Sequence, residues 1–185
     1  MKDISCWGDS LTAGAGPAQR LTFAAYPHQL QLMYGLGRRV HHRGIAGQTS
    51  EQILKRFEAE PQRHADTAVI WIGRNNSSRP AEVVRDLADM TKQMTHGRFL
   101  VLTIVNSTTE PAGSDPYEVQ MHVNRHIADA YANHAFDIRS KLVEASGGTG
   151  DALAADWTLD GLHLSRRAMT FVARQVKVEL DRRVW

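Results

Sequence analysis

The sequence predicts an α/β protein in which helices cover both faces of a central, mostly parallel sheet. Short strand-like segments alternate with longer helical patterns along the whole chain. Two of the strand-like segments, within residues 67–72 and 99–104, are almost continuously apolar, as in parallel strands that are buried on both faces. This alternation predicts a three-layer α/β/α sandwich with right-handed crossovers between its strands.

The first half of the chain supplies two strand–helix pairs. We expect a strand at residues 3–7, which ends at a Gly-containing turn, and a helix at 23–34, which stops before a glycine. A second strand at 39–42 and a second helix at 50–59 follow.

The second half repeats the alternation three times, which brings the expected sheet to five strands. The three strands are expected at residues 67–72, 99–104 and, more weakly, 135–138. The helices that follow them are expected at residues 81–94, 116–133 and 165–183, and proline stands at or just before the start of the first two.

The composition is that of one globular domain, which we place at residues 1–185. Of its 185 residues 42% are hydrophobic and 23% are charged, and we find no repeat, low-complexity tract or long linker. The 22 basic and 20 acidic residues leave a net charge of +2, which is too balanced for a protein that binds nucleic acid. We expect the pairs Arg38-Arg39, Arg166-Arg167 and Arg182-Arg183 to lie on solvated faces.

Cysteine usage and hydropathy exclude further classes. Cys6 is the only cysteine, so there is no internal disulfide framework, and we expect its side chain in the core. No apolar run is long enough to span a bilayer. The chain reaches its first strand-like segment by Ile4 without a signal-peptide pattern, so we expect a cytoplasmic protein, or a secreted one if a leader has been removed. The oligomeric state is left open.

Four polar stretches are expected at one edge of the sheet. Gly8-Asp9-Ser10 falls where the first strand ends, and ligands of open α/β sheets bind outside the carboxyl ends of the strands. The other three stretches follow the second and third strands and precede the last helix; they are residues 44–49 (GIAGQT), 73–76 (GRNN) and 160–163 (DGLH).

These stretches resemble the four ordered sequence blocks of the SGNH (GDSL) hydrolase family. The resemblance implies a flavodoxin-like fold and hydrolysis of esters or thioesters by a serine nucleophile. Carried over residue by residue, it implies these roles: Ser10 the nucleophile, His163 the base, Asp160 the partner of the base, and Gly47 and Asn75 the oxyanion donors beside the Ser10 backbone N–H. The chain departs from the family pattern at Asn76, His42 and Leu164, none of which matches a catalytic group.

The same residues suit nucleophilic catalysis on chemical grounds. A serine hydroxyl needs a base at neutral pH, and His163 can take its proton while Asp160 holds the imidazole and stabilises the imidazolium. A spacing of three within a Gly-containing turn lets one loop present both side chains. Fixed donors must then stabilise the oxyanion, and the Asn75 amide with the backbone of Ser10 and Gly47 would suffice. Glycine suits the last position because a loop amide there must approach the oxyanion closely.

Each of these residues also has a purely structural interpretation. Asp9 or Ser10 could simply cap a helix, Asp160 and His163 could form a loop salt bridge, and Asn75 could close a turn. Asp9 and Arg74 are candidate substrate contacts, although a solvated loop is the commoner place for an arginine such as Arg74.

No cofactor is expected. His122 and His126 stand four residues apart on an expected helix, but Val123 occupies the place of a zinc protease's glutamate, so we expect an exposed helix face and no metal. Gly14-Ala15-Gly16 lacks the third glycine of a dinucleotide fingerprint, and no Gly-Lys-Ser/Thr phosphate loop occurs.

The substrate is the least determined part of the prediction. Residues 74–79 and 106–116, both near the expected site, are polar, which favours a small acyl group such as acetyl on a polar or carbohydrate alcohol. Two alternatives stay open: a thioesterase or lysophospholipase acting on longer acyl chains, and a non-catalytic binding domain of the same fold.

Overall fold

Five parallel strands form the central layer of the computed structural model, which describes residues 2–15, 24–149 and 151–185. The strands are β1 (Ile4–Gly8), β2 (Val40–Gly44), β3 (Thr67–Trp71), β4 (Phe99–Leu102) and β5 (Ala135–Phe136). Their order in the sheet is β2-β1-β3-β4-β5, and every neighbouring pair is parallel. The predicted α/β fold with a flavodoxin-like parallel sheet is confirmed.

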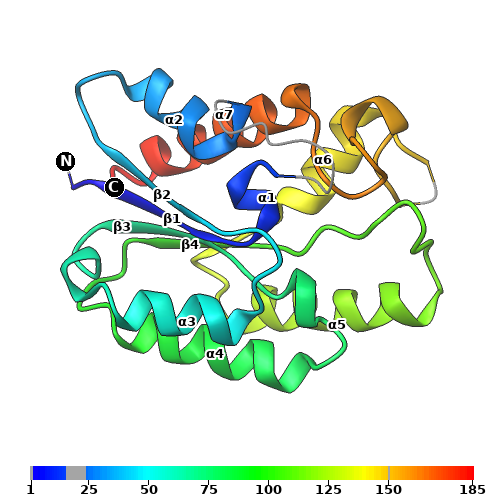
Figure 1. The fold of residues 1–185 in the computed structure, drawn as a ribbon, viewed down its shortest axis with the longest axis horizontal. Helices are drawn as coiled ribbons and strands as arrows, with labels where there is room; N and C mark the ends of the chain where they lie inside the picture. The colour runs from blue at the N-terminus through cyan, green and yellow to red at the C-terminus, as the bar shows by residue number, and fades with distance from the viewer. Residues whose placement is uncertain (1, 16–23, 150) are drawn as a thin grey trace.

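Helices form the two outer layers (Figure 1). One face of the sheet is covered by α1 (Ser10–Ala13), α2 (Tyr26–Tyr34), α6 (Ile138–Ser146) and α7 (Arg166–Arg182). The other face is covered by α3 (Ser50–Glu58), α4 (Pro80–Lys92) and α5 (Asp115–Ala130). Short 3₁₀ turns are η2 (Pro61–Arg63), η3 (Arg74–Asn76) and η4 (Ala155–Trp157). In the described residues, no helix has the length and apolar character that crossing a bilayer requires.

Alternation along the strands fills two cores. In β1, Ile4 and Cys6 join the cluster beneath α2 and α7, whereas Trp7 joins the cluster above α3 and α4. All three side chains are fully buried, and each burial of this kind contributes about 1.5–3 kcal/mol. Cys6 is therefore a core residue as expected, and burial raises the pKa of its thiol to about 12.

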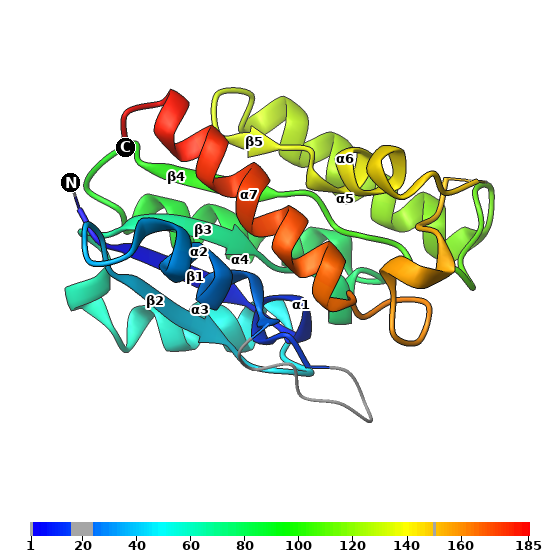
Figure 2. The same cartoon turned by 90° about the horizontal axis from the view of Figure 1, so that it is seen from above.

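The sheet order makes the end of β1 a topological switch point. β1 has β2 on one side and β3 on the other (Figure 2). The chain therefore passes from β1 to β2 in one direction along the sheet, and from β2 to β3 in the opposite direction. Such a switch point is where α/β proteins bind ligands. Ser10 is the first residue after this point that has helical geometry.

Several element boundaries differ from the sequence prediction for local reasons. The expected strand at 135–138 stops at Phe136, because the Asp137 side chain accepts a hydrogen bond from Ser140 N and starts α6, which was not predicted. The strand expected at 99–104 ends at Leu102, and the Asn124 side chain binds both the N–H and the carbonyl of Ile104. The helix expected at 23–34 begins at Tyr26, and residue 23 lies outside the described residues.

One arginine expected on a solvated face is buried instead. Arg38 is 3% exposed and donates to the carbonyls of Lys2 and Trp185 and to the hydroxyl of Thr67. Arg38 thus joins the two ends of the described chain at the edge of the sheet opposite the polar loops. The prediction failed because the partners of Arg38 are distant in sequence.

Candidate active site

The sharp turn between β1 and α1 positions Ser10. Asp9 caps α1 by accepting a hydrogen bond from Leu11 N at 2.9 Å, so Ser10 opens the helix. Gly8 allows the turn to lie close to the sheet, since a Cβ there would come within 2.6 Å of the Trp71 carbonyl oxygen. Gly44 does the same from β2, because its Cβ would lie 2.4 Å from Ala13 N. Backbone packing therefore sets the place of the Ser10 hydroxyl.

The loop before α7 brings two further groups to Ser10. His163 Nε2 lies 3.0 Å from Ser10 Oγ, and His163 Nδ1 lies 2.7 Å from Asp160 Oδ2. The other Asp160 oxygen accepts the backbone N–H of His163 at 2.8 Å, which fixes the carboxylate within its own turn. The structure thus joins the three predicted residues in one hydrogen-bonded relay.

The loop at residues 158–164, here called the His163 loop, is closed like a hairpin. Thr158 and Leu164 form an antiparallel bridge, and Leu159 N donates to the His163 carbonyl at 2.7 Å. At its tip Gly161 has a φ of +90°, a conformation that favours glycine, and its carbonyl accepts Thr108 N at 2.8 Å. The loop is therefore tied both to itself and to the segment after β4.

Asp160 is held as a carboxylate. Burial alone would raise the pKa of Asp160, but hydrogen bonds from the backbone and side chain of His163 outweigh burial and hold that pKa below its ordinary value of 3.8. A carboxylate in this place fixes the imidazole so that Nε2 faces the serine and stabilises the imidazolium formed when His163 accepts a proton.

The two predicted oxyanion loops meet beside this relay. Asn75 lies on η3, and its Nδ2 donates to the Gln48 carbonyl at 2.9 Å and approaches Asp9 Oδ2 at 3.4 Å. The long contact to Asp9 is the weaker of the two, so an oxyanion can replace it at low cost. Gly47 has a φ of +80°, and an added Cβ there would meet no atom within 4 Å. The backbone conformation therefore favours glycine at this position, and the close approach of the Gly47 N–H to an oxyanion stays a prediction.

Asp9 is a buried support for this arrangement. The side chain is 1% exposed, and burial raises the pKa of Asp9 from 3.8 to about 6, although the Leu11 N–H and the Arg74 charge oppose that rise. Its carboxylate is turned to α1 and to Asn75. The geometry therefore gives Asp9 a positioning role in place of the predicted contact with substrate.

Arg74 is held in an ion pair and is not the solvated arginine that was expected. Both Glu110 oxygens lie 3.0 Å from one of its terminal nitrogens, and the two side chains are 13% and 17% exposed. Glu110 also accepts Ser107 N at 2.7 Å and Gln120 Nε2 at 3.0 Å. A contact between Arg74 and a substrate stays a prediction.

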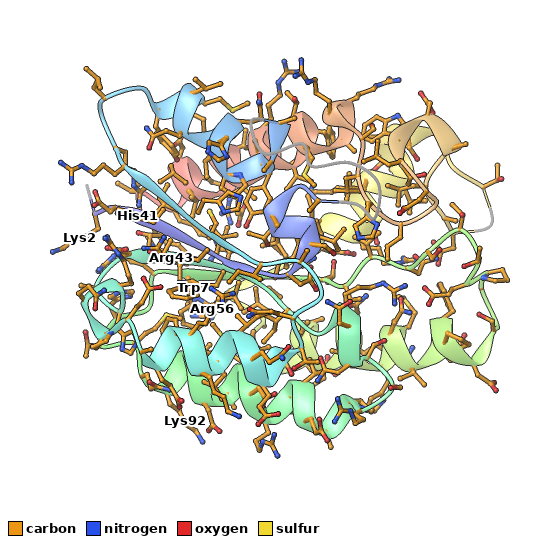
Figure 3. All side chains as sticks on the ribbon, in the orientation of Figure 1. Lys2, Trp7, His41, Arg43, Arg56 and Lys92 are labelled. Carbon is orange, nitrogen blue, oxygen red and sulfur yellow. The ribbon has the colours of Figure 1, made fainter. Side chains whose placement is uncertain are left out.

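Glu110 and Arg56 are supporting residues that sequence reasoning missed. Glu110 links η3 to the segment that holds Gly161, as described above. Arg56 on α3 points toward Trp7 and the end of β2 (Figure 3). Its guanidinium donates to Gln48 Oε1 at 2.7 Å and to the Arg43 carbonyl at 3.1 Å, so it braces the loop that carries Gly47. Their partners are far away in sequence, and no local motif signals them.

Other predicted features lie apart from the relay. His122 is exposed on α5, and the described residues contain no group of three or more His, Cys, Asp or Glu side chains that could hold a metal ion. Of the Gly14-Ala15-Gly16 stretch, Gly16 lies outside the described residues.

The family is shown by a comparison with protein-family models. The model of the GDSL-like lipase/acylhydrolase family matches residues 6–170. A search of curated protein sequences found no significant match.

Solved structures share the fold at low identity. The lipase/acylhydrolase from Enterococcus faecalis superposes with a TM-score of 0.80 at 19% identity, over 99% of this chain and 97% of that chain. A member of the lipolytic G-D-S-L family from Veillonella parvula gives 0.74 at 16% identity, over 95% and 96% of the two chains. A carbohydrate acetylesterase family member from Sinorhizobium meliloti gives 0.70 at 18%, over 98% and 100%. With its family model matched over most of its length, the chain belongs to the GDSL-like lipase/acylhydrolase family and is an ester hydrolase.

Proposed function

We propose that the chain hydrolyses carboxylic esters through an acyl-enzyme formed on Ser10. The observation that carries this proposal is the relay itself, in which His163 lies within hydrogen-bond distance of both Ser10 Oγ and Asp160. A loop salt bridge alone would not require the second nitrogen of His163 to face a buried serine at the end of β1.

In this mechanism the relay moves one proton in each half-reaction. Ser10 Oγ attacks the ester carbonyl while His163 Nε2 takes the hydroxyl proton, and the carbonyl electron pair moves onto the oxygen. The backbone N–H groups of Ser10 and Gly47 and the Asn75 amide stabilise this oxyanion. The imidazolium then protonates the leaving alcohol. Water then attacks the acyl-enzyme while His163 takes one of its protons, the bond between the acyl carbon and Ser10 Oγ breaks, and His163 returns the proton to Ser10 as the acid product leaves.

The test compares the wild type with Ser10→Ala on a chromogenic acetate ester. We expect kcat/KM to fall by at least about a thousandfold, because the remaining residues supply only binding and oxyanion stabilisation. Ser10 is one small side chain at a helix start, so the far-UV circular dichroism should be unchanged. Comparable rates in the two proteins would contradict the assignment of Ser10.

For the substrate, we propose a short acyl group, such as acetyl, on a polar or carbohydrate alcohol. A cavity of about 610 Å³ adjoins the His163 loop, and apart from Leu153 and Leu159 its lining residues are small or polar. Its volume lies in the range of small-ligand sites. The similar fold of the Sinorhizobium meliloti carbohydrate acetylesterase family member is consistent with this class.

A second candidate substrate has a longer acyl chain, as in a thioester or a lysophospholipid. Ile45 and Leu159 are 45% and 39% exposed and belong to the loop after β2 and the loop before α7. Large apolar side chains in that place favour contact with a hydrocarbon chain.

A series of p-nitrophenyl esters from acetate to decanoate separates the two candidates. The acetyl proposal expects kcat/KM to be highest for acetate or butyrate and to change less than about threefold in Leu159→Ser. A maximum at octanoate or decanoate that Leu159→Ser lowers by about tenfold, the worth of about two buried methylenes, would favour the second candidate.

A further inference from the structure

A second cavity lies away from the relay, between α6 and α7. Its volume is about 770 Å³, and its walls come from the last turn of α6, from η4 and from the first half of α7. Both helices lie on the same face of the sheet, where they pack against each other (Figure 1). The lining residues are Ala145, Trp157, Arg166, Arg167, Thr170, Phe171 and Arg174. We call this cavity the α6–α7 groove.

The charge of the groove is not balanced by the protein. Among the described residues, Arg166 and Arg174 have no acidic partner, and Arg167 pairs only with Asp156 at 3.1 Å, where both side chains are 66% exposed. Arg166 and Arg167 are also the first two residues of α7, whose first turn has no acidic residue. Cations at a helix N-terminus oppose the helix dipole, so folding alone does not favour them there.

The wall of the groove is aromatic and contains an unused donor. Trp157 packs edge-on against Phe171 at 5.4 Å, and the Arg167 guanidinium lies 4.8 Å above its ring. The side chain is 3% exposed, and its indole nitrogen, which makes no hydrogen bond in the described part of the chain, keeps some exposure to solvent. An accessible indole N–H without a protein partner is free to donate a hydrogen bond to a bound ligand.

We propose that the α6–α7 groove binds an organic carboxylate that carries an apolar chain. Arginine forks match a carboxylate in geometry as well as charge, and the indole N–H supplies one more donor to it. Trp157, Phe171 and Ala145 provide the apolar surface for the chain. Hydrolysis of an ester releases a molecule of this chemistry. The site is separate from the relay, and it would exist whether or not Ser10 is the nucleophile.

The test is calorimetric titration of the full chain with sodium octanoate. We expect one octanoate per chain, and at least about tenfold weaker binding in Arg166→Gln/Arg174→Gln, because two charge-assisted contacts are lost. Arg182→Gln, on the same helix but outside the groove, is the matched control and should bind as the wild type does. Trp157→Phe keeps the ring, lacks the N–H, and should weaken binding by about threefold or more.

Octanol and acetate separate the two halves of the ligand. Both should bind at least about tenfold more weakly than octanoate, since one lacks the charge and the other the chain. Equal octanoate affinities in the wild type and in the Arg166→Gln/Arg174→Gln variant would overturn the proposal, because binding would then lie elsewhere, for example at the relay. The absence of measurable octanoate binding would overturn it as well. Thermal unfolding of each variant near the wild-type temperature excludes loss of fold as the cause.

Discussion

Replacing Asp9 by asparagine tests the role of a buried acid beside the oxyanion site. One Asp9 oxygen caps α1 through Leu11 N at 2.9 Å, and the other lies 3.4 Å from Asn75 Nδ2. Burial is the main reason why the pKa of Asp9 rises from 3.8 to about 6. Asparagine has nearly the same shape, but it does not titrate, and it has only one oxygen to accept hydrogen bonds.

The effect on stability follows from the direction of that shift. Because the folded state holds the proton of Asp9 more tightly than the unfolded state, this group's contribution to stability is fully present below about pH 4. It is lost as the pH rises through about 6, and the rise from 3.8 to about 6 corresponds to about 3 kcal/mol. Asp9→Asn removes this loss. The free energy of unfolding of the variant, relative to the wild type, should therefore increase by about 2 kcal/mol between pH 4 and pH 7, because part of the loss has already occurred at pH 4.

The effect on activity has the opposite sign at neutral pH. The asparagine oxygen can serve Leu11 N or Asn75 but not both, so its amide N–H meets one of these two donors. We expect kcat for an acetate ester to fall by about tenfold, the worth of one hydrogen bond, with little change in KM. Urea unfolding at four pH values and steady-state kinetics measure both effects. A stability difference that does not change with pH would refute the assignment of a raised pKa to Asp9.

Three further changes separate catalytic from supporting roles. Asn75→Ala should lower kcat by about a hundredfold with little change in KM. Asn76→Ala removes two hydrogen bonds to the buried Ser50, so it should lower the free energy of unfolding by about 1–3 kcal/mol and leave kcat nearly unchanged. A larger loss of kcat at Asn76 than at Asn75 would reverse the assignment. Arg56→Lys should lower kcat about tenfold, since a single ammonium cannot make both contacts of the guanidinium, to Gln48 and to the Arg43 carbonyl. Lys55→Ala, on the exposed side of α3, is the control, and equal kcat values in the two variants would argue against support of the Gly47 loop by Arg56. Glu110→Gln should lower the melting temperature by several degrees, because it breaks the ion pair with Arg74, which has little solvent exposure. An unchanged melting temperature in a thermal scan would argue against a stabilising role for this ion pair.

Much of the fold could be predicted because local sequence and global packing agree. The apolar stretches in β3 and β4 indicated buried parallel strands, and Gly8 at the end of β1 marked the turn that leads to Ser10. α1 was missed because four residues are too few to show a helical period, and α6 was missed because its start depends on one cap, Asp137.

The candidate site divides in the same way. Ser10, Asp160 and His163 lie in short polar stretches whose spacing is visible in the sequence. The residues that hold those stretches in place are not visible. Glu110 pairs with Arg74, which is 36 residues away in the sequence, and Arg56 donates to the carbonyl of Arg43, which is 13 residues away. Such contacts depend on tertiary structure, and a single sequence does not encode their partners in any local pattern.

The candidate site consists of two parts that differ in local stability, the turn that carries Ser10 and the His163 loop. Ser10 is anchored by backbone packing against a fully buried strand, whereas His163 and Asp160 lie on a hairpin whose side chains are 15% and 33% exposed. Regions with few buried contacts open locally before the whole molecule unfolds. On gradual heating, turnover should therefore disappear several degrees below the temperature at which circular dichroism is lost, and cooling from that interval should restore it. The enzyme would then lose activity through a loop that opens while Ser10 is still in place.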